Sequence, residues 1–342
     1  MDGIQNYLPH DVIEGILSRL PVKSLLRFKC VCKQWSATIS APKFAQTHLR
    51  RSKNSSSTIL LVDLENSPEK AQLVDLETEQ FRHSAVDYPV EVSVADVMCH
   101  CDGLYVLWCS DRGYALWNPS RRSYKMLNYQ QYRFDHDQLM CGICYDPLVE
   151  DYNVVMADST HYAVFHCRRN CWSDLKELNL SITIRYDVDD ASGLPLKNGS
   201  IYWLRCVWGE GEVLRYEIVY FDGRDEEMKI LCKADGDSFP VRMISSGECL
   251  RFFARDWDDQ WVEMAMPPAA AAPAMPFGGG YAPLCWTHDG GKILLESSKD
   301  NSLQIYDVSE KSLARVGYPW NVLILHEHRP RLFPHVENVF WD

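Results

Sequence analysis

A zinc site is the first chemistry that the residue types suggest. Four cysteines and two histidines gather between positions 141 and 171: Cys141, Cys144, His161, His166, Cys167 and Cys171. Thiolate sulfur and imidazole nitrogen are the ligands that zinc prefers in proteins. The sequence MCGICYDP around the first pair is typical of a strand, however, and residues three apart on a strand point to opposite faces. We therefore expect buried structural cysteines here and no metal site.

Other polar clusters could also hold a cation. His326 and His328 could share a strand face with His335 nearby, but solvated or packed histidines are more common than a metal site. The acidic residues form three runs, which are Asp187, Asp189 and Asp190; Asp222, Asp225, Glu226 and Glu227; and Asp256, Asp258 and Asp259. None of them has the spacing of an EF-hand loop, so we expect solvated turn residues.

Sequence signatures of the common enzyme classes are absent. The chain has no G-x-G-x-x-G, P-loop, G-x-S-x-G or H-E-x-x-H motif, and residues 278–280 (GGG) do not follow a strand and open a helix. The sequence therefore predicts a protein without catalytic residues and without a cofactor.

The 342 residues have the composition of an ordinary globular protein, with 46% hydrophobic and 24% charged residues. No run of about 18 apolar residues occurs, and the first residues lack the basic and apolar regions of a signal peptide. Thirteen cysteines are an odd number at irregular spacing, as in proteins that keep their thiols reduced. We expect a soluble, cytoplasmic and/or nuclear protein that does not bind membranes.

Charge divides the chain into two parts. Residues 1–53 hold nine lysines and arginines against three acids, a net charge of +6. Because the whole chain has a net charge of −12, residues 54–342 carry −18. A basic head suits an acidic partner, whereas an acidic body repels a phosphate backbone. Nucleic acid is therefore not an expected ligand of the body.

The head is predicted to be helical. Apolar residues recur on one helical face after Leu8-Pro9, at positions Val12, Ile13, Ile16, Leu17 and Leu20. Pro21 ends this helix, a short second helix opens at Ser24, and a third helix ends at Pro42. Three short helices bury little surface, so part of this apolar face is expected to belong to a partner.

The body is predicted to be all-β. Short runs rich in Val, Ile, Tyr, Trp and Phe alternate with Asp, Asn and Gly turns at residues 58–62, 103–108, 152–156, 200–204, 250–254 and 292–296. Turn glycines Gly103, Gly199, Gly247 and Gly290 precede such runs at spacings of 96, 48 and 43 residues, with a turn at Asp151 dividing the longest gap. A period near 48 is typical of a propeller blade, so we expect a β-propeller of about six blades.

Two segments of the body bear on its ends and its regularity. The apolar segments 322–325 and 336–341 are candidates to close the ring by pairing with the first strands. Residues 264–283 hold seven Ala, five Pro and three Gly, a composition typical of a loop. This loop either replaces a blade strand or is an insertion, natural or engineered.

Residues 8–49, LPHDVIEGILSRLPVKSLLRFKCVCKQWSATISAPKFAQTHL, resemble the F-box motif of plant proteins without a gap. The resemblance implies docking on the Skp adaptor of a cullin-RING ubiquitin ligase. It assigns nine residues to the adaptor interface: Leu8, Pro9, Ile13, Ile16, Leu17, Leu20, Pro21, Leu25 and Leu26. About half of these are expected to serve the internal core as well, and Trp35 is expected to hold the third helix in place.

The body resembles the F-box-associated domain of plant F-box proteins, including the S-locus F-box group. The matching pieces follow the family order over about 200 residues: Cys101-Asp102-Gly103-Leu104, Leu116-Trp117-Asn118-Pro119-Ser120-Arg121, Tyr145-Asp146-Pro147 with Asp151-Tyr152, Asn198-Gly199 with Tyr202-Trp203, Tyr220-Phe221-Asp222 and Ile293-Leu294-Leu295. Together these resemblances imply an F-box at 1–50, a linker at 51–58 and a propeller at 59–342.

The function that this organisation implies is that of a non-catalytic substrate receptor in an SCF (Skp-cullin-F-box) ubiquitin ligase. The F-box would bind the Skp adaptor and through it a cullin, while propeller loops capture a protein target, possessing a basic patch if charge guides the encounter. Three tryptophans beside charged turns are candidate target contacts: Trp208, Trp257 and Trp261. The alternatives are an S-locus-type recognition protein or scaffold that does not drive degradation, and a propeller hydrolase that acquired an F-box.

Overall fold

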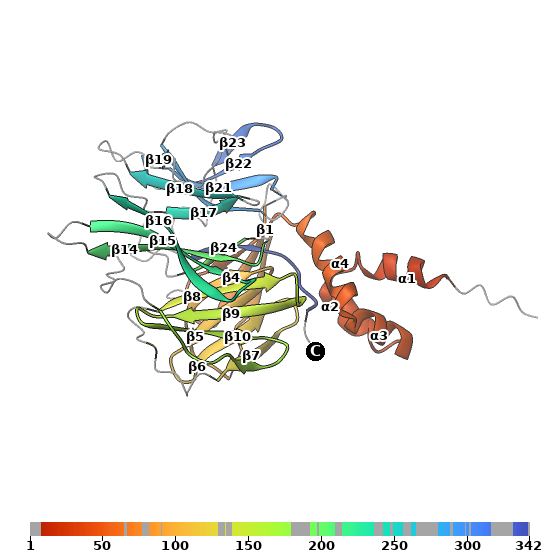
Figure 1. Ribbon diagram of the computed structural model, residues 1–342. Coiled ribbons are helices and arrows are strands. Elements are labelled where there is room, and N and C mark those ends of the chain that lie inside the picture. The colour runs from red at the N-terminus through yellow and green to blue at the C-terminus, as the bar shows by residue number, and fades with distance from the viewer. Residues whose placement is uncertain are drawn as a thin grey trace, which may run out of the picture.

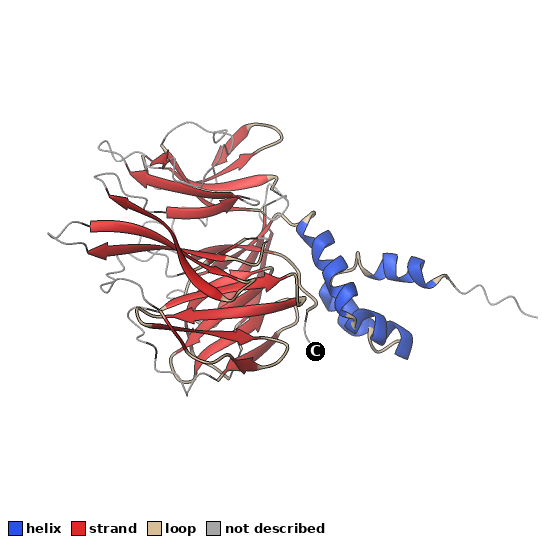
Figure 2. Cartoon of the chain, viewed as in Figure 1, coloured by secondary structure: helices blue, strands red, loops and turns tan. Residues whose placement is uncertain are grey.

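Helices and strands lie in separate parts of the molecule, with the helices at one end of an all-β body (Figure 1, Figure 2). The computed structural model describes residues 8–64, 67–76, 82–89, 91–128, 134, 139–178, 192–196, 198–208, 214–235, 242–246, 249–255, 261–264, 280–287, 290–297, 299–300, 302–315 and 331–340. Among these residues, no helix has the length and apolar character needed to cross a lipid bilayer.

The described residues of the N-terminal part form four helices: α1 (His10–Leu17), α2 (Val22–Phe28), α3 (Lys33–Ser40) and α4 (Pro42–Lys53). The expectation of three helices was wrong because Pro42 does not only end α3. It also occupies the first turn of α4, where a missing N–H costs nothing. Helix α4 buries Phe44, Ala45, His48 and Leu49, a spacing that makes one helical face. The helix extends to Lys53, three residues into the segment expected to be a linker.

The described strands form six sheets, in agreement with the expected propeller of about six blades. Sheet 1 has the order β24 (Arg331–His335), β1 (Thr58–Val62), β2 (Lys70–Asp75), β3 (Arg82–Asp87). Sheet 2 contains β4 (Val94–Cys101), β5 (Leu104–Cys109), β6 (Gly113–Asn118) and β7 (Ser123–Leu127). Sheet 3 contains β8 (Met140–Asp146), β9 (Asp151–Ala157), β10 (His161–His166), β11 (Cys171–Trp172) and β12 (Lys176–Glu177).

The other three sheets follow in chain order. Sheet 4 contains β13 (Leu194–Pro195), β14 (Ile201–Trp208), β15 (Leu214–Asp222) and β16 (Glu227–Asp235). Sheet 5 contains β17 (Arg242–Ser246), β18 (Cys249–Arg255) and β19 (Trp261–Met264). Sheet 6 contains β20 (Tyr281–Trp286), β21 (Lys292–Ser297), β22 (Leu303–Asp307) and β23 (Ser312–Arg315). Because β20 begins at Tyr281, the last three residues of the expected loop 264–283 belong to a strand, while residues 265–279 lie outside the described residues.

The first strands of the sheets contact one another in sequence and close a ring. Strand β4 contacts β8, β8 contacts β13, β13 contacts β17, β17 contacts β20, and β20 contacts β24. Strand β24 returns to β4 through Arg331, whose guanidinium lies 2.9 Å from the Asp96 carboxylate and donates to the Val97 carbonyl at 2.7 Å. The first strands of the sheets therefore face one another around the ring, while the last strand of each sheet forms an outer edge.

The ring is closed by a strand other than those expected from the sequence. Strand β24, residues 331–335, pairs antiparallel with β1 along its whole length. Residues 336–340 continue past the sheet without strand structure, and residues 322–325 lie outside the described residues. The chain therefore joins its C-terminal segment to its first strand, as expected, but uses a strand that the apolar pattern did not single out.

Tight turns at the helix-facing side of the sheets explain the repeated glycines. Gly103, Gly199 and Gly290 all have positive φ angles, of 77°, 82° and 71°, and Gly247 lies outside the described residues. Asp102 also has positive φ (54°), so Asp102-Gly103 forms the kind of two-residue turn that joins β4 to β5 with the correct twist. A Cβ atom at position 103 would lie 2.0 Å from the Val336 carbonyl oxygen, so this turn also requires glycine for space.

The substitution Gly103→Ala is expected to destabilise the protein more than Gly290→Ala does. Both glycines have positive φ, which costs an L-residue about 1–2 kcal/mol. Only position 103 adds a collision, because nothing lies within 4 Å of a Cβ at position 290. Chemical unfolding should therefore show a loss at least about 1 kcal/mol larger for Gly103→Ala. Equal losses would mean that the contact with Val336 does not constrain the turn.

Candidate binding surfaces

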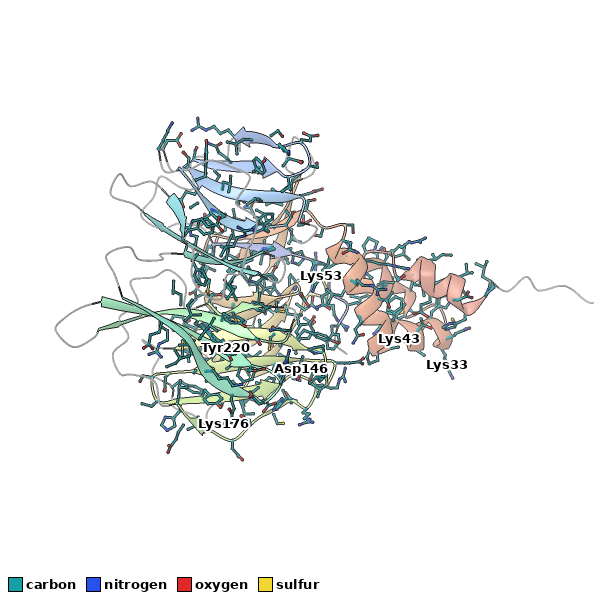
Figure 3. All side chains as sticks on the ribbon, turned by 45° about the horizontal axis from the view of Figure 1, so that its top comes forward. Lys33, Lys43, Lys53, Asp146, Lys176 and Tyr220 are labelled. Atoms are coloured by element: carbon teal, nitrogen blue, oxygen red, sulfur yellow. The ribbon has the colours of Figure 1, made fainter. Side chains whose placement is uncertain are left out.

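The helices expose a group of large apolar side chains. Leu8, Val12, Ile16 and Val31 are 59%, 41%, 47% and 59% exposed. Single exposed apolar residues are common, but four on a module of this size make the helices a candidate contact surface. The basic residues Lys33 and Lys43 are exposed on the same helices, away from the sheets (Figure 3).

The nine residues assigned to the adaptor interface fall into three groups. Leu8, Pro9, Ile16 and Pro21 are exposed; Ile13, Leu20 and Leu26 are half-buried; and Leu17 and Leu25 are buried. The buried pair packs inside the module and cannot contact a partner without rearrangement. Val12 and Val31 are exposed residues that the resemblance did not assign. Val12 belongs to the predicted apolar stripe, and Val31 fits the i, i+3, i+4, i+7 spacing of apolar residues between Phe28 and Ile39.

Aromatic packing joins α2 to α3. The rings of Phe28 and Trp35 meet edge to face, with centroids 5.5 Å apart. The Trp35 amide donates to the Cys32 sulfur at 3.4 Å at the start of α3. Trp35 thus holds the third helix against the second, as expected from the sequence.

Three polar contacts join the helices to the sheets. The Lys53 ammonium lies 2.5 Å from the Asp102 carboxylate, at the place where α4 meets the sheets (Figure 3). Burial is the largest single effect on the pKa of Lys53 and lowers it, but the charge and hydrogen bond of Asp102 together with Cys101 raise the pKa above its usual value. The Gln46 amide donates to the Tyr145 hydroxyl at 2.5 Å, and the Val22 amide donates to the Glu337 carboxylate at 2.8 Å.

His48 is a buried titratable group at this junction. Its side chain is 2% exposed, its Nε2 lies 2.9 Å from the Leu20 carbonyl, and its ring stacks on Phe44. Burial lowers the pKa of His48, against the opposing effects of the Leu20 carbonyl and the Glu337 carboxylate. Arg51 lowers it further. The folded protein therefore favours the neutral imidazole, which donates its Nε2 proton to Leu20.

The face of the propeller opposite the helices carries the candidate target contacts. In an antiparallel sheet, the turn between the second and third strands lies opposite the turn between the first and second. The Asp102-Gly103 turn faces the helices, so the β5–β6 turn lies on the opposite face, next to Trp108, which is 37% exposed. Trp108 was not singled out from the sequence, in which nothing separates it from the core tryptophans.

Two of the three tryptophans expected to bind a target stand at strand ends on this opposite face. Trp208 is the last residue of β14 and pairs with Leu214, at the end of the strand away from the Gly199 turn. Trp261 is the first residue of β19 and pairs with Arg255 across the β18–β19 turn. Trp257 lies outside the described residues.

The cysteines considered as zinc ligands point in different directions. Cys141 belongs to the apolar cluster shared with the helices, whereas Cys144 belongs to the cluster between sheets 3 and 4. Burial raises the pKa of the Cys144 and Cys167 thiols, which keeps both protonated. Cys171 is exposed, and the described residues contain no cluster of three or more potential metal ligands.

The remaining polar clusters have structural contacts where they are described. The ammonium of Lys229 pairs with Asp222 and Asp225 in the β15–β16 turn. His335 is buried, with its Nδ1 2.9 Å from the Tyr105 hydroxyl. His326, His328 and the acidic runs at 187–190 and 256–259 lie outside the described residues.

Comparison with known proteins matches both parts of the chain. Residues 6–47 match the family described as F-box domain, and residues 50–260 match the family described as F-box associated beta propeller domain. F-box protein At3g17710 of Arabidopsis thaliana is 30% identical over 248 residues, which cover 66% of this chain and 62% of that protein.

Two further relatives come from the same plant. Putative F-box only protein 15 is 29% identical over 270 residues, covering 73% of this chain and 66% of that protein. Putative F-box/kelch-repeat protein At1g12170 is 27% identical over 258 residues, covering 70% and 67%. The matched part of this chain thus spans slightly less than two thirds of the first two relatives.

The buried state of His48 predicts a pH dependence of stability. Because its pKa is lowered in the folded protein, the unfolded chain binds more protons below its ordinary value of 6.5. The free energy of unfolding should therefore fall as the pH falls below about 6.5. His48→Gln, which keeps a donor for Leu20, is expected to flatten this dependence in unfolding curves recorded between pH 7.5 and 5.

The control is His10→Gln, which changes an exposed histidine of the same helices. It should keep the wild-type dependence. A wild-type dependence that survives in His48→Gln would show that another group causes it.

Proposed function

Since the chain belongs to the family of proteins with an F-box and an F-box-associated β-propeller domain, we propose that it is the substrate-recognition subunit of an SCF ubiquitin ligase. Helices α1 to α3 would bind the Skp adaptor, and through it a cullin. The propeller would capture a target protein for ubiquitination. The chain itself would supply no catalytic group, because a receptor of this kind accelerates transfer by holding the target close to the other subunits.

The observation that carries the proposal is the exposed apolar surface of the helices. Four apolar side chains face solvent in the free chain: Leu8, Val12, Ile16 and Val31. Burying them against a partner would add hydrophobic stabilisation that the free chain does not have. The net charge of +6 on residues 1–53 favours an acidic partner. The family suggests a Skp adaptor as this partner, which the chain would meet in the cytoplasm or the nucleus.

Target capture is proposed for the face opposite the helices. Trp108 is exposed there, the strand ends bearing Trp208 and Trp261 lie there, and Trp257 belongs to the connection between β18 and β19. Loops on a rigid scaffold commonly carry recognition, and tryptophan is frequent among residues that dominate binding energy. The net charge of −18 on residues 54–342 supports a target with a basic patch.

Adaptor binding by the intact chain tests the first half of the proposal. A variant with Leu8→Ala and Ile16→Ala should bind a recombinant plant Skp adaptor at least about tenfold more weakly, a loss of about 1.4 kcal/mol. Its melting temperature should stay within about one degree of wild type, because both side chains are exposed. Calorimetric titration measures the affinity.

The matched control is Leu148→Ala, an exposed leucine of the propeller (74% exposed), which should leave adaptor affinity unchanged. Failure of the folded wild-type chain to bind any Skp adaptor would refute the ligase role. A target whose level does not change after proteasome inhibition would indicate a scaffold that binds without driving degradation.

Target capture is tested with the intact chain as bait. A variant with Trp108→Ala, Trp208→Ala and Trp261→Ala should lose proteins retained by wild type from a plant extract, as measured by quantitative mass spectrometry. Its adaptor affinity should equal that of wild type, which shows that the chain is folded. Retention of the same proteins at the same level would show that the face opposite the helices is not the capture surface.

A further inference from the structure

We propose that residues 336–340, here called the C-terminal strap, fix the orientation of the F-box helices on the propeller. The strap follows β24 and runs between the sheets and the helices (Figure 1). The inference rests on the proposed function, because a fixed orientation matters when the helices and the opposite face hold different partners. It adds a positioning role for a segment outside both binding surfaces.

The strap is anchored to the propeller by Asn338, which is fully buried. Its Nδ2 donates to the Asp102 carbonyl at 2.8 Å, and its Oδ1 accepts from the Phe340 amide at 2.8 Å. Its main-chain carbonyl accepts from Asn118 Nδ2 at 3.0 Å. A buried side chain with its donors and acceptors paired holds one geometry, since any other leaves polar groups without partners.

The residues after Asn338 add further contacts to sheets 2 and 3. The Arg121 guanidinium donates to the Val339 carbonyl at 3.0 Å. The ring of Phe340 meets Tyr152 edge to face with centroids 5.1 Å apart, and the Arg168 guanidinium lies 5.9 Å from the Phe340 ring centre. The strap therefore belongs mechanically to the propeller.

The same strap also holds the helices. The carboxylate of Glu337 accepts the Val22 amide at the start of α2, at 2.8 Å, and lies close enough to His48 of α4 to affect its pKa. Val339 and Phe340 belong to one apolar cluster with Leu17 and Leu25. One five-residue segment thus contacts the propeller on one side and α2 on the other, with His48 of α4 close by.

A second tie converges on the same turn. Asp102 receives Lys53 of α4 on one carboxylate oxygen and the Tyr152 hydroxyl, at 3.2 Å, on the other. Asn338 holds the carbonyl of this same residue. The covalent connection between α4 and β1 is short, residues 54–57, so the orientation of the two parts depends on these ties together with the Gln46–Tyr145 hydrogen bond and the shared apolar cluster.

Glu337 is the residue that separates positioning from simple stabilisation of the propeller. Its carboxylate contacts the helices, whereas Asn338 and Phe340 contact the sheets. Glu337→Ala should release α2 from the strap while leaving the propeller network intact. Glu337→Gln keeps an oxygen acceptor of the same shape and should retain the tie.

The experiment measures the distance between the two parts of the full-length chain without any partner. Spin labels are placed on genetically encoded non-cysteine residues at Lys33 of α3 and Asp111 of the β5–β6 turn, so that the native thiols are not touched. Wild type and Glu337→Gln should give one narrow distance distribution. Glu337→Ala should broaden it at least about twofold while its far-UV circular dichroism remains that of wild type.

The matched control is Glu310→Ala, an exposed glutamate in the turn between β22 and β23, which should give the wild-type distribution. Asn338→Ala serves as a second test that removes the other anchor of the strap, and should both broaden the distribution and lower stability. A narrow distance distribution in Glu337→Ala, or a broad one in wild type, would contradict the proposed positioning role of the C-terminal strap. Because no adaptor is present, a chain that binds no Skp adaptor would refute the proposed function and leave this result standing.

Discussion

The buried contact between Asn338 and the Asp102-Gly103 turn is the constraint on which the arrangement of the molecule depends. The turn must approach the strap so closely that a Cβ atom at position 103 would meet the Val336 carbonyl oxygen. The turn's aspartate receives Lys53 from the last helix, and its carbonyl receives Asn338 from the C-terminal segment. Removing one partner from a buried polar group of this kind costs about 1–3 kcal/mol. Helix α4, the Asp102-Gly103 turn and the C-terminal strap are therefore held together at one place.

This constraint gives the two surfaces of the molecule different directions. Helix α1, which carries the exposed Val12 and Ile16, lies beyond the junction on the side away from the sheets (Figure 1). The aromatic strand ends lie at the other face of the ring, because each antiparallel sheet sends its alternate turns to opposite faces. Under the proposed function, this arrangement would hold an adaptor and a target at a set separation, as a receptor that works by proximity requires.

Local patterns in the sequence were enough to predict three of the four described helices, many strands, the turn glycines Gly103, Gly199 and Gly290, and the approximate number of blades. Periodic apolar residues and positive-φ glycines depend on neighbours in the chain, so they can be recognised before the fold is known. The fourth helix was missed because Pro42 both ends one helix and begins another. Position 103 was recognised as a turn glycine, but its second reason, the approach of Val336, depends on a residue 233 positions away.

The candidate surfaces were less predictable, for a physical reason. One apolar stripe supplies both the internal core and the exposed face of a small helical module, so the sequence does not say that Leu17 and Leu25 are buried while Leu8 and Ile16 are exposed. The apolar segment at 336–341 was expected to be a strand, but residues 336–340 cross two sheets and meet the helices, and the contacts that hold them there are long-range.

Hydrogen–deuterium exchange of the full chain with and without a Skp adaptor tests the central claim most directly. The account predicts slower exchange in residues 8–40 and unchanged exchange at the strand ends around Trp108, Trp208 and Trp261, whereas protection confined to those strand ends, or no protection of the helices, would contradict it.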